Sequence, residues 1–155
     1  MQASAVIEMV CAAFSDVPRP KYTLAESAVA DEWGDESVRF QEHDSSWEEI
    51  PDDQIARNTA AFCFLPPGSW RYYIPAYVVW SLRHVRDYKT ETPAHLIYTL
   101  TKNDNASMFR DSLTSQQRQA IFAFLSFWRG EYFDELDDKG HALWASHASN
   151  AVCDC

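Results

Sequence analysis

The stretch AAFCFLPPGSWRYYIPAYVVWSL, residues 60–82, decides the fold of this chain, because it is the longest apolar run in the sequence. It holds five of the chain's Trp and Tyr residues, of which there are six and seven. Such rings can form a recognition surface, since Trp, Tyr and Arg dominate binding hot spots. They can also pack in a core with their OH and N–H groups at its edge. We expect the core arrangement for most of them, since large aromatic side chains are highly buried on average.

Three prolines divide this stretch: Pro66, Pro67 and Pro75. Each lacks a backbone N–H and restricts the residue before it, so backbone hydrogen bonding has to stop and restart there. We predict a helix that ends near Leu65 and a tight turn at Pro-Pro-Gly. A single helical turn from Trp70 to Tyr73 follows, and a new helix begins at Pro75.

Elsewhere, apolar residues recur at three- and four-residue spacing, which is typical of amphipathic helices. The clearest case follows the capping-box pattern TSQQ at 114–117 and places four apolar residues on one face: Ile121, Phe124, Leu125 and Trp128. The chain has only four glycines and no repeat or linker. We therefore predict a mainly α fold, with a compact single domain of about six to seven helices over residues 1–150 and a loose tail at 151–155. Residues 37–46 are compatible with a short β element or with more helix.

The charge balance restricts the partners that this chain can bind. Lys and Arg number 13 against 23 Asp and Glu, which gives a formal net charge of −10. A nucleic-acid binder needs a basic surface to neutralise phosphates, and docking on anionic lipids needs basic residues as well. We therefore expect no nucleic acid and no membrane, and a basic protein is the natural electrostatic complement.

Other features favour the reducing cytoplasm. The N-terminal residues 1–10 lack a basic region and carry Glu8 within an apolar run, so they make a poor signal peptide. No stretch approaches the roughly twenty apolar residues of a membrane span. Cys11 and Cys63 lie in apolar contexts and are expected to be buried thiols. Cys153 and Cys155 have no second ligand pair at zinc-site spacing, so we assign no metal.

Acidic residues are concentrated between residues 26 and 53. This segment contains a single base, Arg39, and eleven acids: Glu26, Asp31, Glu32, Asp35, Glu36, Glu42, Asp44, Glu48, Glu49, Asp52 and Asp53. Such a run is most often a solvated face. It can also dock a basic partner by matching its potential and steering its approach.

Signatures of catalysis are missing from the sequence. Ser69 follows Gly68 but lacks the second glycine of a nucleophile elbow, and Cys63 has no charged neighbour to lower its pKa. The histidines are scattered without a spaced carboxylate to orient a base, and no phosphate-binding glycine loop or metal-binding motif occurs. The sequence therefore favours a non-enzymatic function, and we assign no catalytic residue and no cofactor.

Three segments carry a resemblance to a known family: WEEI at 47–50, FLPPGSWRYYIPAY at 64–77 and LTSQQRQAIFAFL at 113–125. They resemble a family of small bacterial cytosolic proteins that is catalogued only as a domain of unknown function. The resemblance covers roughly residues 40–130, and WRYYIPA is its most specific part. It implies no catalytic residues, and it points to proteins similar to immunity proteins, which bind and neutralise a cognate toxin.

These observations lead to one main hypothesis, an acidic protein-binding module that acts as an immunity or inhibitor protein against a basic effector toxin. We expect the acidic segment and an exposed fringe of aromatic residues to bind the partner: Glu42, Asp44, Trp47, Glu48, Glu49, Asp52, Asp53, Trp70, Arg71 and Tyr72. One alternative is a hydrolase or metal-dependent enzyme with a cleft beside Pro66–Pro75 that uses Arg71, Tyr72, Tyr73 and His84. Another is a self-associating structural subunit, a homo-oligomer that buries its surplus aromatic residues.

Overall fold

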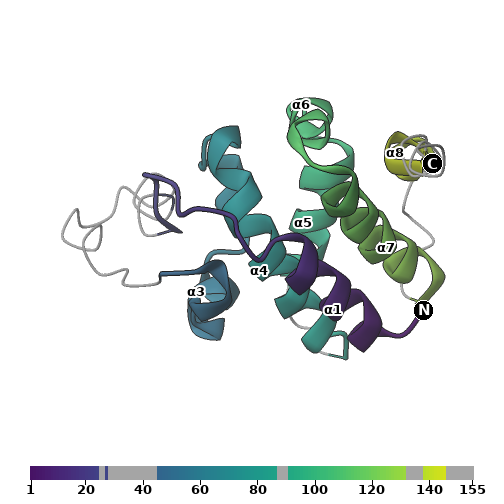
Figure 1. The fold of residues 1–155 in the computed structure, drawn as a ribbon, viewed down its shortest axis with the longest axis horizontal. Coiled ribbons are helices and arrows are strands. Elements are labelled where there is room, and N and C mark those ends of the chain that lie inside the picture. The colour runs from purple at the N-terminus through teal and green to yellow at the C-terminus, as the bar shows by residue number, and fades with distance from the viewer. Residues whose placement is uncertain (25–26, 28–44, 87–90, 132–137, 146–155) are drawn as a thin grey trace. The chain divides into compact units, whose positions relative to one another are not determined.

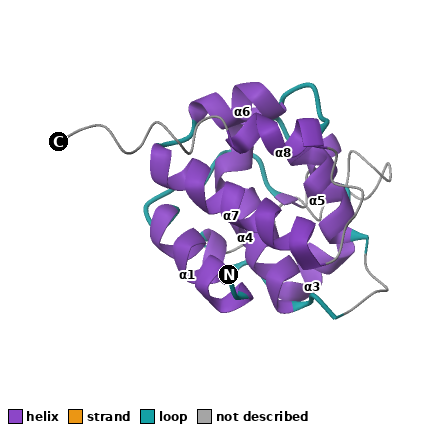
Figure 2. Cartoon of the chain, turned by 90° about the vertical axis from the view of Figure 1, so that its right-hand side faces the viewer, coloured by secondary structure: helices purple, strands orange, loops and turns teal. Residues whose placement is uncertain are grey.

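The computed structural model of the chain describes residues 1–24, 27, 45–86, 91–131 and 138–145 (Figure 1). These residues form seven α-helices and three short 3₁₀ helices, and no strand occurs among them (Figure 2). The prediction of a mainly α fold with six to seven helices is therefore confirmed. Within the stretch 37–46, Ser45 and Ser46 form a bend, while residues 37–44 lie outside the described part of the chain, as does the tail 151–155.

The chain divides into two compact units. The first consists of residues 1–15 and 97–155, and the second consists of residues 16–96. The single domain expected over residues 1–150 stays a prediction. In the part of the chain that the structure describes, no helix has both the length and the apolar character needed to cross a membrane.

In the first unit, α1 (Ala3–Ala13) packs along α7 (Ser115–Glu131), as Figure 1 shows. Val6 and Val10 of α1 are fully buried. The predicted stripe of α7 is buried as well, with exposed fractions of 0 to 4% for its four members: Ile121, Phe124, Leu125 and Trp128. The three- and four-residue spacing of the apolar side chains thus identifies the buried face of each helix.

The start of α7 is fixed by the predicted capping box. The backbone N–H of Thr114 donates to Oε1 of Gln117 over 3.1 Å, and the backbone N–H of Gln117 donates to Oγ1 of Thr114 over 3.2 Å. The side-chain amide of Gln117 also donates to the carbonyl of Ala13 over 3.1 Å. One buried glutamine therefore caps α7 and ties it to the end of α1.

Three shorter helices complete the first unit. They are α6 (Ala106–Ser112), α8 (Asp138–Ala145) and the second half of α5 (Thr92–Thr101), whose first half belongs to the second unit. Phe109 of α6 and Trp144 of α8 are buried, and their ring centroids lie 6.3 Å apart. This contact places an aromatic anchor of α8 against α6.

The second unit is built around α4 (Trp70–Arg83), which has twelve buried residues. Around it lie η2 (Trp47–Glu49), α3 (Asp52–Arg57), η3 (Ala61–Cys63) and η4 (Pro67–Ser69). The hydroxyl of Tyr73 donates to the carbonyl of Tyr22 over 2.7 Å, and that of Tyr77 donates to the carbonyl of Asn58 over 2.6 Å. The aromatic bodies thus fill the core and their polar tips reach backbone at its edge, as expected for most of these rings.

The structure corrects two details in residues 60–82. Pro75 does not begin a helix, because α4 starts at Trp70 and runs through it. The hydrogen bond that residue 75 would otherwise donate is lost, but burial of the helix on both sides of the proline keeps it continuous. No helix runs on to Leu65, since α3 ends at Arg57 and only the 3₁₀ turn η3 follows. Cys63, at the end of that turn, is exposed rather than buried.

Candidate functional site

Four carboxylates of the predicted binding segment lie together on the surface of the second unit. Glu48 and Glu49 belong to η2, and Asp52 and Asp53 form the first turn of α3, where negative charge suits the helix dipole. All four are exposed, and we call them the acidic ridge. Three buried side chains anchor the same segment to the core: Trp47, Ile50 and Ile55, with 3, 6 and 3% exposed. The acids therefore stand on a fixed piece of backbone.

Two of the ridge carboxylates have partners of their own. Oε2 of Glu49 accepts the backbone N–H of Ser45 over 3.0 Å, and the Ser45 hydroxyl lies 3.1 and 3.0 Å from the two carboxylate oxygens. These hydrogen bonds, the backbone one first, lower the pKa of Glu49 from its ordinary value of 4.5. Asp53 pairs with Arg57 over 2.8 Å on the solvent-exposed side of α3. The ionised form of Glu49 is thereby favoured, and the Asp53 carboxylate is engaged by a neighbouring guanidinium.

The other two ridge carboxylates, Glu48 and Asp52, make no hydrogen bond or ion pair with any residue that the structure describes. They present full charges to solvent beside the two anchored groups. With respect to the described residues, such charges are available to a partner without first breaking a contact, which lowers the free energy needed to dock.

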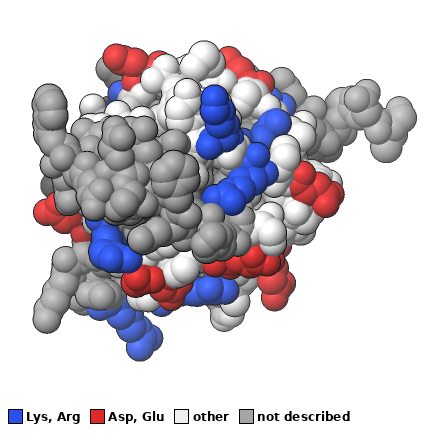
Figure 3. Space-filling view, turned by 90° about the vertical axis from the view of Figure 1, so that its left-hand side faces the viewer, with Lys and Arg blue, Asp and Glu red and all other residues white. Residues whose placement is uncertain are grey.

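The charge around the ridge is mixed. In the described part of the second unit, six acids (Asp16, Glu48, Glu49, Asp52, Asp53 and Glu91) balance six bases (Arg19, Lys21, Arg57, Arg71, Arg83 and Arg86). Figure 3 likewise shows acidic and basic side chains interspersed on one face of the molecule. The sequence of residues 25–44, of which the structure describes Ser27 alone, carries seven acids and one base, or a net charge of −6. The ridge is thus continuous in sequence with the most acidic segment of the chain.

The three rings expected at an exposed fringe of the site are buried, so the prediction of their exposure is wrong. Trp47, Trp70 and Tyr72 are 3, 1 and 1% exposed, so these rings belong to the core and cannot touch a partner on the surface. The indole N–H of Trp70 donates to the carbonyl of Leu65 over 3.1 Å, within the protein. Arg71 is half-buried. Two further predicted residues, Glu42 and Asp44, lie outside the described part of the chain. Among the described residues of the predicted site, the four ridge carboxylates are the ones that lie together at the surface.

Groups named for the alternative enzyme site have structural roles. Tyr72 and Tyr73 are buried, and the Tyr73 hydroxyl is bound to the backbone of Tyr22. The imidazole of His84 stacks on Trp80 with centroids 4.2 Å apart, and its Nδ1 lies 2.8 Å from the Trp80 carbonyl. No group of three or more His, Cys, Asp or Glu side chains among the described residues is placed to hold a metal ion.

A serine and a histidine meet in the first unit, a contact that sequence reasoning missed. Nε2 of His141 in α8 lies 3.1 Å from Oγ of Ser126 in α7, and its Nδ1 lies 3.1 Å from Nη1 of Arg129. A catalytic serine needs a base that accepts its proton and is oriented by a carboxylate. Here the group beside Nδ1 is a guanidinium, which can only donate and cannot take the place of the carboxylate. The contact therefore contains a serine and a histidine, but among the described residues it lacks the carboxylate that orients the base of a catalytic serine.

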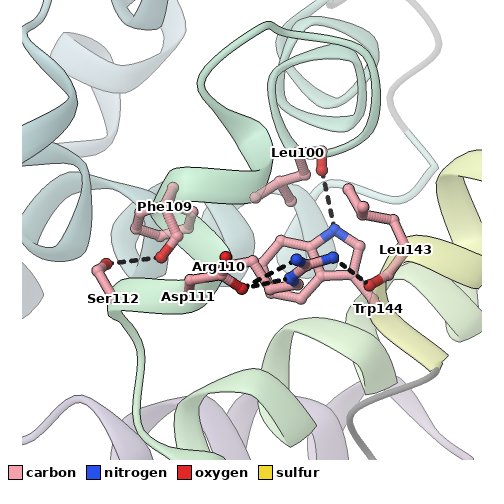
Figure 4. Close-up of polar contacts among 7 residues, drawn as sticks. All are labelled: Leu100, Phe109, Arg110, Asp111, Ser112, Leu143 and Trp144. Atoms are coloured by element: carbon pink, nitrogen blue, oxygen red, sulfur yellow. Dashed lines mark hydrogen bonds and ion pairs between the residues drawn. The ribbon is translucent and has the colours of Figure 1, made fainter.

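Helix α8 is also held by hydrogen bonds to and from its last turn (Figure 4). The indole N–H of Trp144 donates to the Leu100 carbonyl over 2.8 Å, and Nη1 of Arg110 donates to the Leu143 carbonyl over 2.9 Å. Asp111 accepts from Nε of Arg110 over 2.9 Å. Donors from Trp144 and Arg110 thus satisfy last-turn carbonyls of α5 and of α8, as side-chain caps do at helix ends. The arrangement docks a helix and offers no reactive group.

Comparison with known proteins gives one match. Neither the search of curated proteins nor the search of solved structures found a similar chain. A family model described as "Family of unknown function (DUF6714)" matches residues 2–150. The match confirms the resemblance to a family of unknown function and extends it well beyond residues 40–130. Because it covers nearly the whole sequence, the chain belongs to the DUF6714 family.

Proposed function

We propose that this chain is a non-enzymatic binding protein whose acidic ridge docks on a basic protein. The observation that carries the proposal is the ridge itself: four exposed carboxylates on a segment that Trp47, Ile50 and Ile55 anchor in the core. Charges on an ordered segment bind without the entropic penalty of ordering it, and a matching potential accelerates association. The most concrete form of this function is an inhibitor or immunity protein that neutralises a basic effector toxin.

The partner is to be found first, by native co-purification from the source cell. We expect one basic protein at fixed stoichiometry, released by added salt, because electrostatic association weakens with ionic strength. The association rate is then measured for the ridge-reversal variant Glu48→Lys, Glu49→Lys, Asp52→Lys and Asp53→Lys. Long-range steering raises association rates by about 10–1000-fold, so reversing the ridge should remove a large part of that gain.

A second variant separates the ridge from the overall charge. Glu8→Lys, Asp16→Lys, Glu91→Lys and Asp104→Lys change four exposed acids outside the ridge and shift the net charge by the same amount. This control should associate much faster than the ridge-reversal variant. Equal association rates for the two variants would show that bulk charge alone acts, and an unchanged rate in the ridge-reversal variant would refute the proposal. Circular dichroism of both variants checks that they remain folded.

A further inference from the structure

One carboxylate of the acidic ridge already holds a cation that belongs to this chain. The Arg57 guanidinium donates from Nη2 to Oδ2 of Asp53 over 2.8 Å and from Nε to the Asp53 backbone carbonyl over 3.2 Å. Two N–H groups of one planar guanidinium thus contact two acceptors of the same residue. Glu48 and Asp52 have no such contact with a described residue, and the partner of Glu49 is a serine. Among the described contacts of the ridge, Asp53 is therefore the acid that faces a cation.

Helix α3 has other anchors than this contact. Ile55 is 3% exposed and fixes the middle of the helix in the core. At its end, the backbone N–H and the side-chain amide of Asn58 both donate to the Gln54 carbonyl, over 3.1 and 2.7 Å, and the Asn58 carbonyl accepts a hydroxyl from α4 over 2.6 Å. The side chains of Arg57 and Asp53 are 72 and 70% exposed. An ion pair this exposed contributes little to stability, so a partner can break it at low cost.

We propose that Arg57 is an internal competitor of the basic partner: its guanidinium holds Asp53 in the free protein, and a cationic side chain of the partner replaces it on docking. This inference rests on the function proposed for the ridge and assigns a residue that limits it. A partner that covers the ridge would bring its own cations close to an Arg57 left in place. Like charges brought together across an interface disfavour the complex. Arg57 therefore leaves Asp53 and turns outward when the partner docks.

The competitor makes the ridge selective. A partner with a cation placed over Asp53 exchanges one ion pair for another, whereas a basic surface without a cation at that point leaves the Asp53–Arg57 pair intact and meets the positive charge of Arg57. Specificity of this kind combines an attractive group for the right partner with a repulsive one against the others. The ridge thus requires a cation at one position and not only a basic surface.

The dissociation constant of the complex with the co-purified basic partner tests the competitor. An exposed ion pair is worth about two- to fivefold in an equilibrium constant, so Arg57→Gln should lower the dissociation constant by about that factor. Arg83→Gln is the matched control, because Arg83 is an exposed arginine in the last turn of α4, as Arg57 is in the last turn of α3. Arg83 makes no ion pair with a described residue. The control changes the net charge equally and should tighten binding much less.

A second background locates the effect at Asp53. In the Asp53→Asn protein there is no ion pair to break, so the gain from Arg57→Gln should fall to that of the control. Arg57→Lys keeps the charge but loses the bond from Nε to the Asp53 carbonyl. It should give a smaller gain in the same direction, and it replaces the Gln variant if circular dichroism shows that the latter loses helix.

Two results would overturn the inference: an Arg57→Gln protein that binds no more tightly than Arg83→Gln, or a gain that is the same with and without the Asp53 carboxylate. Either result leaves the proposed function standing if the ridge-reversal variant still associates slowly. An unchanged association rate in the ridge-reversal variant refutes the proposed function, and this inference with it. The two failures are therefore distinguishable.

Discussion

Gly140 shows how one missing side chain permits a contact between two helices. A Cβ atom at this position would lie 2.7 Å from Cβ and 3.1 Å from Cγ2 of Thr101. Contacts below 3.0 Å do not persist, and Cβ of Thr101 is fixed to its backbone, so α8 would have to move away from α5. Gly68, in η4, has no atom within 4 Å of the corresponding position. A substitution at Gly68 is therefore the control for the same substitution at Gly140.

We expect Gly140→Ala to destabilise the protein. Overpacking costs about 1–3 kcal/mol, which outweighs the gain of up to about 1 kcal/mol in helix propensity. Gly68→Ala should leave the free energy of unfolding unchanged or raise it by about 0.4–1 kcal/mol, because the residue fits and the unfolded chain loses entropy. Urea unfolding of both variants measures the difference. Equal stability of the two would show that α8 has room at Gly140.

Glu49 should contribute to stability in an acid-dependent way. Its pKa is lowered by the hydrogen bonds from Ser45, so folding favours the ionised carboxylate. That contribution is present above pH 4.5, the ordinary value, and is lost as the pH falls from there through the lowered folded pKa. Glu49→Gln should therefore flatten the decline of unfolding free energy below pH 4.5. Glu48→Gln, which changes a neighbouring acid without such contacts, is the control, and identical acid profiles for the two variants would contradict the assignment.

Single residues also show where sequence reasoning fails. Trp47, expected at an exposed fringe, is buried in a 3₁₀ turn, although two exposed glutamates follow it. The exposure of Trp70 and Tyr72 was misjudged because α4 is buried on nearly all sides, whereas a local pattern cannot show how many neighbours a helix has. The Ser126–His141 contact joins residues of two helices, and no spacing rule connects them.

Among the helices, the start of α7 was predictable because the residues that determine it are close together in the sequence. Thr114 and Gln117 form both reciprocal bonds of a capping box, and their pattern is visible within four residues. The continuity of α4 through Pro75 was not predictable, because it depends on burial by elements elsewhere in the chain. Short sequence patterns thus predicted where α7 begins, but they did not predict that α4 continues through Pro75.

The capping box can be tested by removing one hydroxyl. Thr114→Ala should lower the free energy of unfolding by about 1 kcal/mol, within the 0.5–2 kcal/mol range of N-cap losses. Thr114→Ser keeps the acceptor for the Gln117 N–H and should retain most of the stability. Thermal or urea unfolding measures both. A Ser variant as unstable as the Ala variant would mean that the methyl group, and not the cap, matters.

The tyrosine hydroxyls of α4 can be tested in the same way. Tyr77→Phe removes the donor to Asn58 and leaves the ring, so we expect a loss of about 0.5–1.5 kcal/mol, the net value of one hydrogen bond. Tyr98→Phe is the control, because Tyr98 is 53% exposed. Urea unfolding should separate the two variants, and a Tyr77→Phe protein as stable as the unaltered chain would show that this bond contributes nothing.

For the whole molecule, the open question is whether the two units unfold together. If residues 1–150 form one cooperative domain, as the sequence predicts, a core change in either unit should lower the stability of both. Ile121→Ala in the first unit and Val78→Ala in the second each remove a fully buried side chain. Deletions of buried Leu or Ile to Ala cost about 2–5 kcal/mol. Hydrogen exchange should show reduced protection in both units for each variant, and loss confined to the altered unit would mean separate domains.

The aromatic and arginine donors of the core share one kind of acceptor. Five of these side chains donate to a backbone carbonyl: Tyr73 to that of residue 22, Tyr77 to 58, Trp70 to 65, Trp144 to 100 and Arg110 to 143. Every amino acid has that carbonyl, so the residue at the acceptor position can be exchanged without losing the bond. An inserted or deleted residue would instead move the carbonyl out of reach. Among members of the family, acceptor positions such as 22 and 58 should therefore vary in sequence, while the lengths of the segments that carry them are conserved.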